Sequence, residues 1–202
     1  MLLVDVGNTN IKIYKDGTIK SYKAIFDFEF PKEKFYYISV NSKLSNILEE
    51  LDNAIDIEPM IDLQSDYKGL GIDRKVVCKA VYDGVIVDAG SAITVDVMEK
   101  GVHKGGFILP GVRSFRQSFA NISDRLDYEL DKSIDLNKLP QDTKEALSFA
   151  TFGSVKCLID SVRDDKKITL TGGDGELFLR YFKDCVYKKD LIFDGMREVI
   201  GC

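Results

Sequence analysis

The sequence predicts an α/β protein made of two related halves. Two apolar strands, at residues 2–6 and 85–89, each end in an aspartate and a glycine turn, and each turn leads into a second strand of alternating polarity. Between these repeats a strand is followed by an amphipathic helix, a succession typical of α/β folds. The 202 residues are 45% hydrophobic and 30% charged, enough to bury the core of one large domain or of two small ones.

The first half begins with a strand, a turn and a second strand. Residues 2–6 form an apolar run that predicts a buried strand, and residues 7–10 predict a turn. Ile11 and Ile13 then alternate with polar residues, which predicts a second strand before the hairpin turn Asp16-Gly17.

A strand and two helices complete the first half. Residues 36–40 predict a further strand, and Asn41-Ser42 are typical residues for the N-cap of a helix. The apolar residues on one face of that helix are Leu44, Ile47, Leu48 and Leu51. A later helix is expected to be capped by Asp73 and to reach about Tyr82, before a turn at Asp83-Gly84.

The second half repeats the start of the first. Val87-Asp88-Ala89-Gly90-Ser91-Ala92 has the same form as Val4-Asp5-Val6-Gly7-Asn8-Thr9, and close to half the chain separates the two segments. Residues 93–98 then alternate in polarity as residues 11–14 do. A duplication of one unit is the economical explanation of this pattern.

The boundary between the halves is expected near Asp83, which gives an N-terminal half of residues 1–83 and a C-terminal half of residues 84–202. In the second half, the glycine-containing segment 105–111 precedes a helix that we expect over residues 112–120.

The rest of the second half is expected to alternate helices with strands. A polar stretch that contains Asp124, Asp127, Asp131 and Asp135 predicts an exposed connection before a long helix over residues 143–162. The apolar residues expected on the buried face of this helix are Leu147, Ala150, Val155, Leu158, Ile159 and Val162. The last expected elements are a strand at 168–171, a turn at 172–175, a helix at 176–182 and a strand at 191–193.

Composition and charge restrict the partners. No run approaches the roughly 18 uncharged apolar residues of a membrane span, and the first residues reach an aspartate too early for a signal peptide. We therefore expect a cytoplasmic location and no membrane partner. The net charge is −5, and no stretch is rich enough in lysine and arginine to predict a nucleic-acid partner.

Cysteine and histidine usage argues against several familiar chemistries. Cys78, Cys157, Cys185 and Cys202 are widely spaced and form no Cys-x-x-Cys pair, so we expect buried thiols rather than a zinc or redox site. His103 is the only histidine, which excludes a zinc-protease helix and leaves a Ser-His-Asp triad dependent on that residue alone.

Three predicted strands end in glycine turns, at residues 5–9, 88–92 and 171–175. Glycine lets a backbone approach a phosphate closely, because it lacks a Cβ and tolerates positive φ. The P-loop pattern is absent, and Gly69-x-Gly71 lacks the third glycine of a dinucleotide motif. Any one such turn more often only connects strands, but the three together favour a different nucleotide site.

The residue types around the turns suit phosphate and a cation. Asn8 and Thr9 would hydrogen-bond phosphate oxygens, Lys12 would neutralise them, and Asp5 would hold Mg²⁺ directly or through water. An aspartate at the end of a buried strand is costly unless it is paired or binds a cation, so Asp5 and Asp88 both favour an ion site.

The segment Gly71-Ile72-Asp73-Arg74 allows two interpretations. Asp73 could be a helix N-cap with Arg74 solvated. Alternatively, Asp73 could accept the proton of a substrate hydroxyl while Arg74 binds an anionic substrate group. Tyr67 and His103 could equally be ordinary loop or core residues.

Four segments in this order resemble the type III pantothenate kinases over nearly the whole chain. They are Asp5-Val6-Gly7-Asn8-Thr9-Asn10-Ile11-Lys12, Gly71-Ile72-Asp73-Arg74, Asp88-Ala89-Gly90-Ser91-Ala92-Ile93-Thr94-Val95-Asp96 and Gly105-Gly106-Phe107-Ile108-Leu109-Pro110-Gly111. Gly172-Gly173-Asp174 also resembles the loop on the nucleoside side of that family's site.

The resemblance implies a fold and a reaction. The fold is that of the acetate kinase, sugar kinase and actin superfamily, with two ribonuclease-H-like halves and an interdomain ATP cleft. The implied reaction transfers the γ-phosphoryl group of ATP to the hydroxyl of pantothenate, giving 4′-phosphopantothenate, the first committed step towards coenzyme A. The implied cofactors are ATP, Mg²⁺ and a monovalent cation, K⁺ or NH₄⁺.

The resemblance also implies roles for individual residues. Asp73 is implied to be the general base. The implied ATP-binding residues are Asp5 (with Mg²⁺), Val6, Gly7, Asn8, Thr9, Asn10, Ile11, Lys12 and Ser91, and Asp88 is implied to bind the monovalent cation. The implied pantothenate-binding residues are Tyr67, Gly71, Ile72, Asp73, Arg74 and Thr143, the last of these reaching the substrate from the second subunit of a homodimer.

The sequence departs from the family at Ser91, where threonine is usual; serine keeps the hydroxyl and loses a methyl group. Thr143 could equally be only the first turn of the long helix. Two other functions stay open: another phosphotransferase or a phosphate-ester hydrolase of the same superfamily, and a nucleotide-dependent regulatory or scaffolding protein, since this family was also linked to an accessory factor in transcription.

Overall fold

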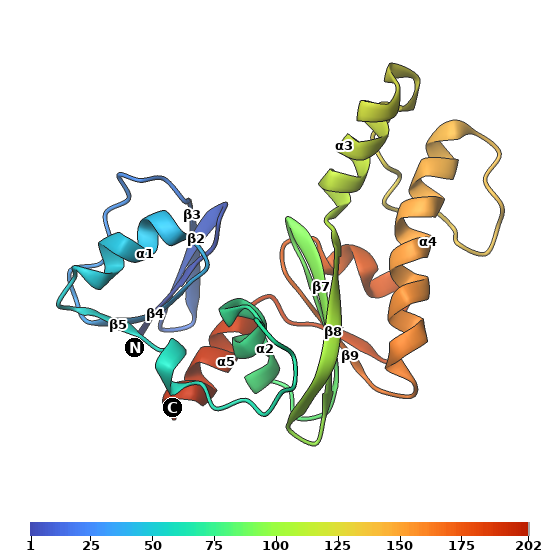
Figure 1. Cartoon of the computed structure of the whole chain (residues 1–202). Coiled ribbons are helices and arrows are strands. Elements are labelled where there is room, and N and C mark those ends of the chain that lie inside the picture. The colour runs from blue at the N-terminus through green and yellow to red at the C-terminus, as the bar shows by residue number, and fades with distance from the viewer. Residues whose placement is uncertain (202) are drawn as a thin grey trace. The chain divides into compact units, whose positions relative to one another are not determined.

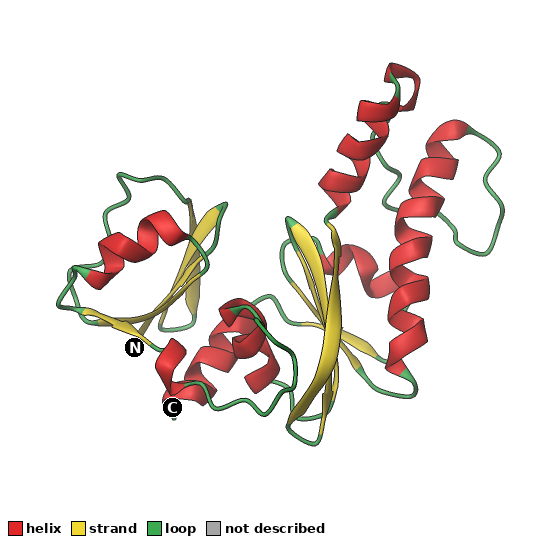
Figure 2. Ribbon diagram, viewed as in Figure 1, coloured by secondary structure: helices red, strands yellow, loops and turns green. Residues whose placement is uncertain are grey.

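The computed structural model describes residues 1–201, which form two compact units (Figure 1). The first unit contains residues 1–82 and 100–103 together with the C-terminal segment from Asp190 onward, and the second contains residues 83–99 and 104–189. Each unit has one five-stranded sheet with helices (Figure 2). The assignment of residues 1–83 and 84–202 to two ancestral halves stays a prediction.

The sheet of the first unit has the strand order β3-β2-β1-β4-β5. Its strands are β1 (Leu2–Val6), β2 (Asn10–Lys15), β3 (Thr18–Lys23), β4 (Phe35–Ser39) and β5 (Ala54–Asp56). β1 pairs antiparallel with β2 and parallel with β4, and β4 pairs parallel with β5. The predicted opening of strand, turn and strand is confirmed.

The sheet of the second unit has the strand order β10-β9-β6-β7-β8. Its strands are β6 (Gly84–Ala89), β7 (Ala92–Glu99), β8 (Val102–Pro110), β9 (Ile168–Thr171) and β10 (Cys185–Tyr187). β6 pairs antiparallel with β7 and parallel with β9, and β9 pairs parallel with β10. Read from the other edge, the order and directions match those of the first sheet, so the strand order confirms the predicted fold of two related α/β halves.

Helices connect or follow the strands of both sheets. They are α1 (Ser42–Glu49), α2 (Ile72–Lys79), α3 (Val112–Ile122), α4 (Thr143–Arg163) and α5 (Leu191–Ile200), with 3₁₀ turns η1 (Glu58–Met60), η2 (Asp124–Leu126) and η3 (Gly175–Tyr181). The predicted cap of α1 is confirmed, because the Asn41 side chain accepts a hydrogen bond from the Leu44 backbone N–H at 3.2 Å.

Two predicted helix boundaries and one predicted strand are wrong. The N-cap of α2 is Gly71 rather than Asp73, and α2 ends at Lys79 rather than near Tyr82. Residues 191–193 begin helix α5 rather than a strand, because a short apolar run is ambiguous by itself and the pattern continues with helical spacing to Met196. Residues 176–182 lie largely in 3₁₀ turns rather than in an α-helix.

Helix α4 confirms the predicted long helix but not all of its buried face. Leu147, Val155 and Ile159 are buried, whereas Ala150 and Leu158 are exposed, Leu158 at 42%. Phe152, which the sequence analysis left out, is fully buried against the second sheet's core. The connection before α4 exposes most of its aspartates, but its Leu130 and Ile134 are buried in the same core.

The C-terminal helix packs in the first unit. α5 lies against α2 (Figure 1), although the sequence places it after the whole second sheet. Gly195 makes the close approach possible, because a Cβ there would overlap the Val76 carbonyl of α2. Tyr14 of β2 also stacks on Phe193, with ring centroids 5.4 Å apart.

The cysteines only partly match the expectation of buried thiols. Cys78 is buried, Cys185 is partly buried, and Cys157 is exposed on α4. Cys202 lies outside the described residues. None of the helices in residues 1–201 is both long and apolar enough to span a membrane.

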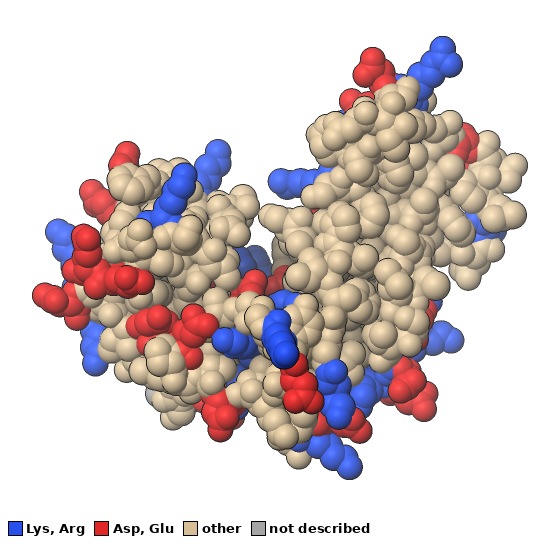
Figure 3. Space-filling view, in the orientation of Figure 1, with Lys and Arg blue, Asp and Glu red and all other residues tan. Residues whose placement is uncertain are grey.

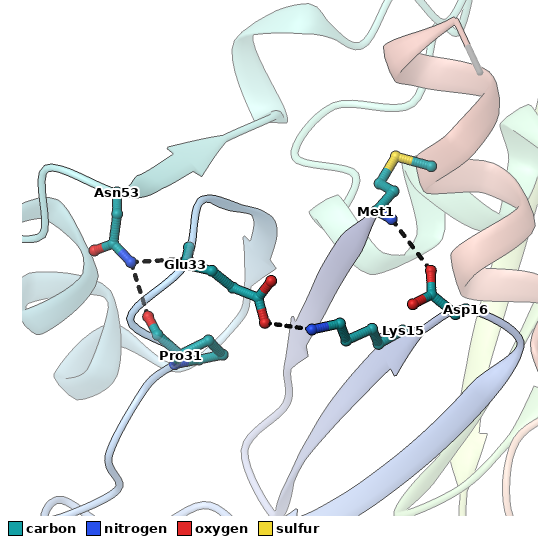
Figure 4. A network of polar contacts seen from close by, with 6 residues as sticks. All are labelled: Met1, Lys15, Asp16, Pro31, Glu33 and Asn53. Carbon is teal, nitrogen blue, oxygen red and sulfur yellow. Dashed lines mark hydrogen bonds and ion pairs between the residues drawn. The ribbon is translucent and has the colours of Figure 1, made fainter.

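Hydrogen bonds and an ion pair attach the loop between β3 and β4 to neighbouring parts of the first unit. Asn53 donates hydrogen bonds to the carbonyls of Pro31 and Glu33 at 2.8 and 2.9 Å, and the Glu33 carboxylate pairs with Lys15 at 2.6 Å (Figure 4). On the face shown in Figure 3, basic and acidic side chains lie among one another. Exposed ion pairs of this kind contribute little to stability.

Candidate functional site

The first glycine turn connects the end of β1, where Asp5 lies, to β2. Asp5 lies opposite Lys12 in the antiparallel register, and Asp5 Oδ2 is 3.4 Å from Lys12 Nζ. The Asp5 side chain is 14% exposed and that of Lys12 is 37% exposed. The turn is closed by a hydrogen bond of 3.0 Å from the Gly7 N–H to the Asn10 carbonyl, and a Cβ on Gly7 would press on that carbonyl.

The charge of Asp5 is only partly compensated. Burial raises the pKa of the Asp5 carboxyl, Lys12 opposes this rise through its charge and a hydrogen bond, and the nearby negative charge of Asp73 raises the pKa further. A cation near Asp5 would favour the ionised carboxylate. The influence of Asp73 also shows that the turn and the start of α2 lie in one electrostatic environment.

The other residues of this turn divide into two kinds. Asn8, Thr9 and Asn10 are exposed, whereas Val6 and Ile11 are fully buried in the core of the first unit. Val6 and Ile11 can therefore contribute only their backbone groups to a ligand. Asn41, which the sequence predicted only as a helix cap, also donates from its side chain to the Gly7 carbonyl at 3.5 Å and so links the turn to the cap of α1.

The second and third glycine turns lie together in the second unit. Asp88 pairs with Thr171 in the parallel register of β6 and β9, and Gly172 follows at a φ of +82°. A Cβ on Gly172 would overlap both the Asp88 carboxylate and the Ala89 carbonyl. The Asp174 N–H donates to that carbonyl at 2.8 Å, so the two turns are directly hydrogen-bonded.

The segment that ends in Gly111 contacts the second glycine turn. The Gly111 N–H donates to the Ser91 carbonyl at 3.2 Å, and the Ser114 hydroxyl donates to it at 3.4 Å. A Cβ on Gly111 would overlap the carbonyls of Gly90 and Ser91, so only glycine fits there. Helix α3 thus begins directly against the second glycine turn.

Tyr187 of β10 supports the third glycine turn, a role that the sequence analysis did not assign. Its hydroxyl donates to the Gly172 carbonyl at 3.0 Å, and its ring lies against Gly175, where a Cβ would be 3.0 Å from Tyr187 Cε2. A tyrosine at the end of a short, weakly patterned strand offers little signal in the sequence alone.

The start of α2 contradicts the interpretation of Asp73 as the helix N-cap with a solvated Arg74, and the interpretation that gives both residues a role at the substrate stays a prediction. Asp73 Oδ1 accepts a hydrogen bond from the Arg74 N–H at 2.8 Å, and Gly71 leaves room for it, because a Cβ there would be 2.7 Å from Asp73 Oδ1. Arg74 is only 4% exposed rather than solvated. Its guanidinium carbon lies 4.8 Å from the centre of the Tyr67 ring, a cation–π contact.

Tyr67 lies in a segment that is attached to His103. The Tyr67 ring is 39% exposed and lies 6.0 Å from the His103 ring, and His103 is buried at 2% exposure. Ser65, Tyr67, Lys75 and apolar neighbours line a cavity of about 330 Å³ in the first unit. A separate cavity of about 820 Å³ in the second unit lies between α4 and residues 134–137 and 180–183, and no predicted site residue lines it.

The predicted site residues therefore form two groups and one outlier. Asp5, Lys12 and Asp73 share an electrostatic environment in the first unit, where Arg74 contacts Tyr67. In the second unit, the turns that contain Asp88, Ser91 and Gly172 are in contact. Thr143 is exposed at the start of α4 and has no polar side-chain contact within the described single chain, residues 1–201.

Comparisons with known proteins agree on one family. A family model described as type III pantothenate kinase matches residues 29–165. A type III pantothenate kinase of Helicobacter hepaticus is 42% identical over 205 residues, with 99% of this chain and 98% of the relative covered.

Solved structures match the whole chain. A Campylobacter jejuni protein, described as a conserved Baf family transcriptional activator, superposes with a TM-score of 0.93 at 39% identity and covers 100% of this chain and 98% of its own. A Sinorhizobium meliloti protein, described as a 2-dehydro-3-deoxygalactonokinase, has a TM-score of 0.61 at 9% identity over 98% of this chain and 95% of its own. The second likeness shows the fold alone.

Proposed function

The chain belongs to the type III pantothenate kinase family, which phosphorylates pantothenate in coenzyme A biosynthesis, and we propose how its residues divide this work. The first glycine turn binds the ATP phosphates, and the turns of the second unit contact the nucleotide and a monovalent cation. Asp73 orients the pantothenate hydroxyl and accepts its proton. The observation that supports this most directly is the shared environment of Asp5, Lys12 and Asp73 in the first unit.

The phosphate role of the first turn follows from its exposed polar groups. Asn8 and Thr9 offer side-chain hydrogen bonds, and Asn10 adds an amide. Lys12, partly exposed next to Asp5, can turn its ammonium group towards a phosphate oxygen. Ser91 offers its hydroxyl from the second unit, where Gly90 and Gly111 keep the turn close to the start of α3.

Two cation sites fit the residues present. Asp5 is a largely buried carboxylate whose pKa is raised by burial despite the charge of Lys12, and a carboxylate oxygen is a ligand that Mg²⁺ prefers. The Asp88 carboxylate lies against Gly172, as the Ala89 carbonyl does, and oxygen atoms of these two kinds are suitable ligands for K⁺. When bound, these cations neutralise charge on the phosphates.

The acceptor role of Asp73 follows from its fixed position. With the Arg74 N–H bonded to Oδ1, the carboxylate is held at the start of α2, where it can orient the pantothenate hydroxyl and accept its proton. As the hydroxyl oxygen bonds to the γ-phosphorus, the bond to the β-phosphate oxygen breaks and ADP leaves. Tyr67, Gly71, Ile72 and Arg74 would surround pantothenate, Ile72 through its backbone because its side chain is buried.

The proposal includes a homodimer and a cytoplasmic reaction. Thr143, exposed at the start of α4, would contact pantothenate bound to the partner subunit. Its neighbour Asp142 caps α4 by accepting from the Glu145 N–H at 2.8 Å, which fixes the backbone at Thr143. The reaction uses ATP, so we place it in the cytoplasm.

The test is release of ADP by the purified protein with Mg²⁺ and ATP, with and without pantothenate, in potassium and in sodium buffers. We expect release that requires pantothenate and is faster in potassium. Faster release with pantothenate but equal rates in both buffers would contradict the cation role of Asp88. ATP binding with no pantothenate-dependent release would contradict the kinase assignment and favour a regulatory protein.

A further inference from the structure

Ser65 and His103 form a buried contact that connects two distant parts of the first unit. The Ser65 hydroxyl oxygen lies 2.7 Å from His103 Nδ1, and the two residues also form a parallel β-bridge. The backbone supports the same contact, because the His103 N–H donates to the Gln64 carbonyl at 3.0 Å. His103 is 2% exposed, so it is a firm attachment point rather than a surface residue.

The same serine oxygen holds Tyr67. The Tyr67 N–H donates to Ser65 Oγ at 3.1 Å, so one hydroxyl binds both the histidine ring and the tyrosine backbone. Gln64, Asp66, Tyr67 and Lys68 are all exposed, and this short segment has no helix of its own. The hydrogen bonds of Ser65 and His103 therefore help to fix its conformation.

Tyr67 in turn contacts Arg74. The guanidinium lies 4.8 Å from the ring centre, and Arg74 directly follows Asp73, whose carboxylate accepts the Arg74 N–H. Arg74 is buried, so its position depends on the surfaces that surround it, and one of these is the Tyr67 ring. A displaced Tyr67 would both open the surface beside Arg74 and change the rim of the 330 Å³ cavity that Ser65 and Tyr67 line.

We propose that Ser65, held by His103, is a positioning residue for the acceptor substrate. Ser65 fixes Tyr67 in the orientation in which the Tyr67 ring contacts Arg74. In this orientation Tyr67 forms part of the surface against which pantothenate binds. This inference rests on the proposed function, since it takes Tyr67 and Arg74 to surround pantothenate. Ser65 acts through Tyr67 and takes no part in the transfer itself.

The test compares Ser65→Ala with Ser65→Thr in steady-state kinetics for both substrates. Loss of the hydroxyl should raise the KM for pantothenate by about tenfold, the order expected for one lost hydrogen bond at a binding surface. The kcat and the KM for ATP should stay within about twofold, because the phosphate turn and Asp73 are unchanged. Ser65→Thr keeps the hydroxyl and should restore the lower KM.

A control and a second measurement separate positioning from general destabilisation. Ser161→Ala removes a serine hydroxyl that donates to the Leu158 carbonyl at 2.7 Å in α4, and it should leave both KM values unchanged. Hydrogen exchange of the Tyr67 N–H should become faster in Ser65→Ala than in the wild type, while exchange in α4 stays the same.

Each outcome decides between the two proposals. If the wild type phosphorylates pantothenate and Ser65→Ala has an unchanged KM for pantothenate, the positioning role is overturned and the proposed function stands. Equal increases in the KM for both substrates, with a lower melting temperature, would also overturn it and show a structural role. If the wild type shows no pantothenate-dependent release of ADP, the proposed function fails, and this inference fails with it.

Discussion

The Asp5 carboxylate and the Lys12 ammonium group lie 3.4 Å apart, side by side on antiparallel strands at the point where β1 enters the first glycine turn. Despite this partner, burial and the charge of Asp73 leave the Asp5 pKa raised. The folded protein therefore holds a carboxylate that is more costly to ionise than in the unfolded chain, a cost that a bound cation would offset.

Replacing Asp5 by asparagine should separate stability from function. Without Mg²⁺ and ATP, we expect the Asp5→Asn variant to be as stable as the wild type at pH 7 or more stable, because the costly charge is gone. Turnover should fall by on the order of 10²-fold or more, as when a group that stabilises transition-state charge is removed. Thermal unfolding and ADP release measure the two effects.

The stability difference should depend on pH in a definite direction. Because the Asp5 pKa is raised on folding, the unfolded chain loses this proton first, and the wild type loses stability as pH rises from the ordinary aspartate value of about 3.9 through the folded value. The advantage of the asparagine variant should therefore vanish below that range. Asp16→Asn, which changes an exposed carboxylate 3.5 Å from the N-terminal amine, is the matched control and should show neither effect. If the stability of Asp5→Asn relative to the wild type were lower at pH 7 than at pH 3.5, this explanation would be wrong.

Asp73→Asn should affect the chemical step rather than nucleotide binding. Asparagine keeps the size and can still accept from the Arg74 N–H, but it cannot take a proton, so kcat should fall about 10²-fold or more. ATP affinity, measured by titration calorimetry, should stay within about twofold. Asp62→Asn, an exposed change elsewhere in the first unit, should retain full turnover. A fully active Asp73→Asn enzyme would remove Asp73 from the role of base.

Two neighbouring glycines provide a sharp test of the third turn. Gly172→Ala places a methyl group onto the Asp88 carboxylate and the Ala89 carbonyl at a φ of +82°, and it should cost roughly 2 kcal/mol or more of stability and weaken ATP binding. Gly173→Ala meets open space, with no atom within 4 Å of the new Cβ, and should change neither property. Chemical denaturation of both variants measures the change in stability, and titration with ATP measures the change in binding. Equal effects of the two substitutions would show that the contact with Asp88 is unimportant.

The glycine turns could be predicted from the sequence because local chemistry determines them. An aspartate that ends an apolar strand, followed by glycine and a small polar residue, is visible in Asp5-Val6-Gly7-Asn8 and again in Asp88-Ala89-Gly90-Ser91. Their repeat predicted two related halves, and the two sheets have matching strand orders. The contact between Gly172 and Asp88 agrees with the idea that the turns serve one ligand.

The parts that could not be predicted depend on contacts between distant segments. The sequence left open whether Arg74 is solvated or binds an anionic group, and only the tertiary structure places it on Tyr67. Ser65 carried no motif, and its partner His103 is 38 residues away. The three apolar residues at 191–193 fit a strand or a helix equally well, and packing against α2 selects the helix.

That packing leads to the last prediction, which concerns Gly195 of α5. A Cβ there would overlap the Val76 carbonyl of α2, the helix that begins with Asp73, so Gly195→Ala must push the two helices apart. Overpacking of this kind typically costs about 1–3 kcal/mol. We expect a clear loss of stability in chemical denaturation, and a rise in the KM for pantothenate in the variant that remains folded, since α2 carries Asp73 and Arg74, for which we propose a role at the acceptor.

The matched control is Gly153→Ala in α4, where the new Cβ would meet only side-chain atoms at 3.8 Å or more. Alanine is the better helix former, so this variant should be as stable as the wild type or more stable by up to about 1 kcal/mol. The comparison tests whether the C-terminal helix supports the proposed acceptor residues at the start of α2. If Gly195→Ala proves as stable and as active as Gly153→Ala, α5 is not tightly packed on α2 and the C-terminal segment has no part in shaping the acceptor site.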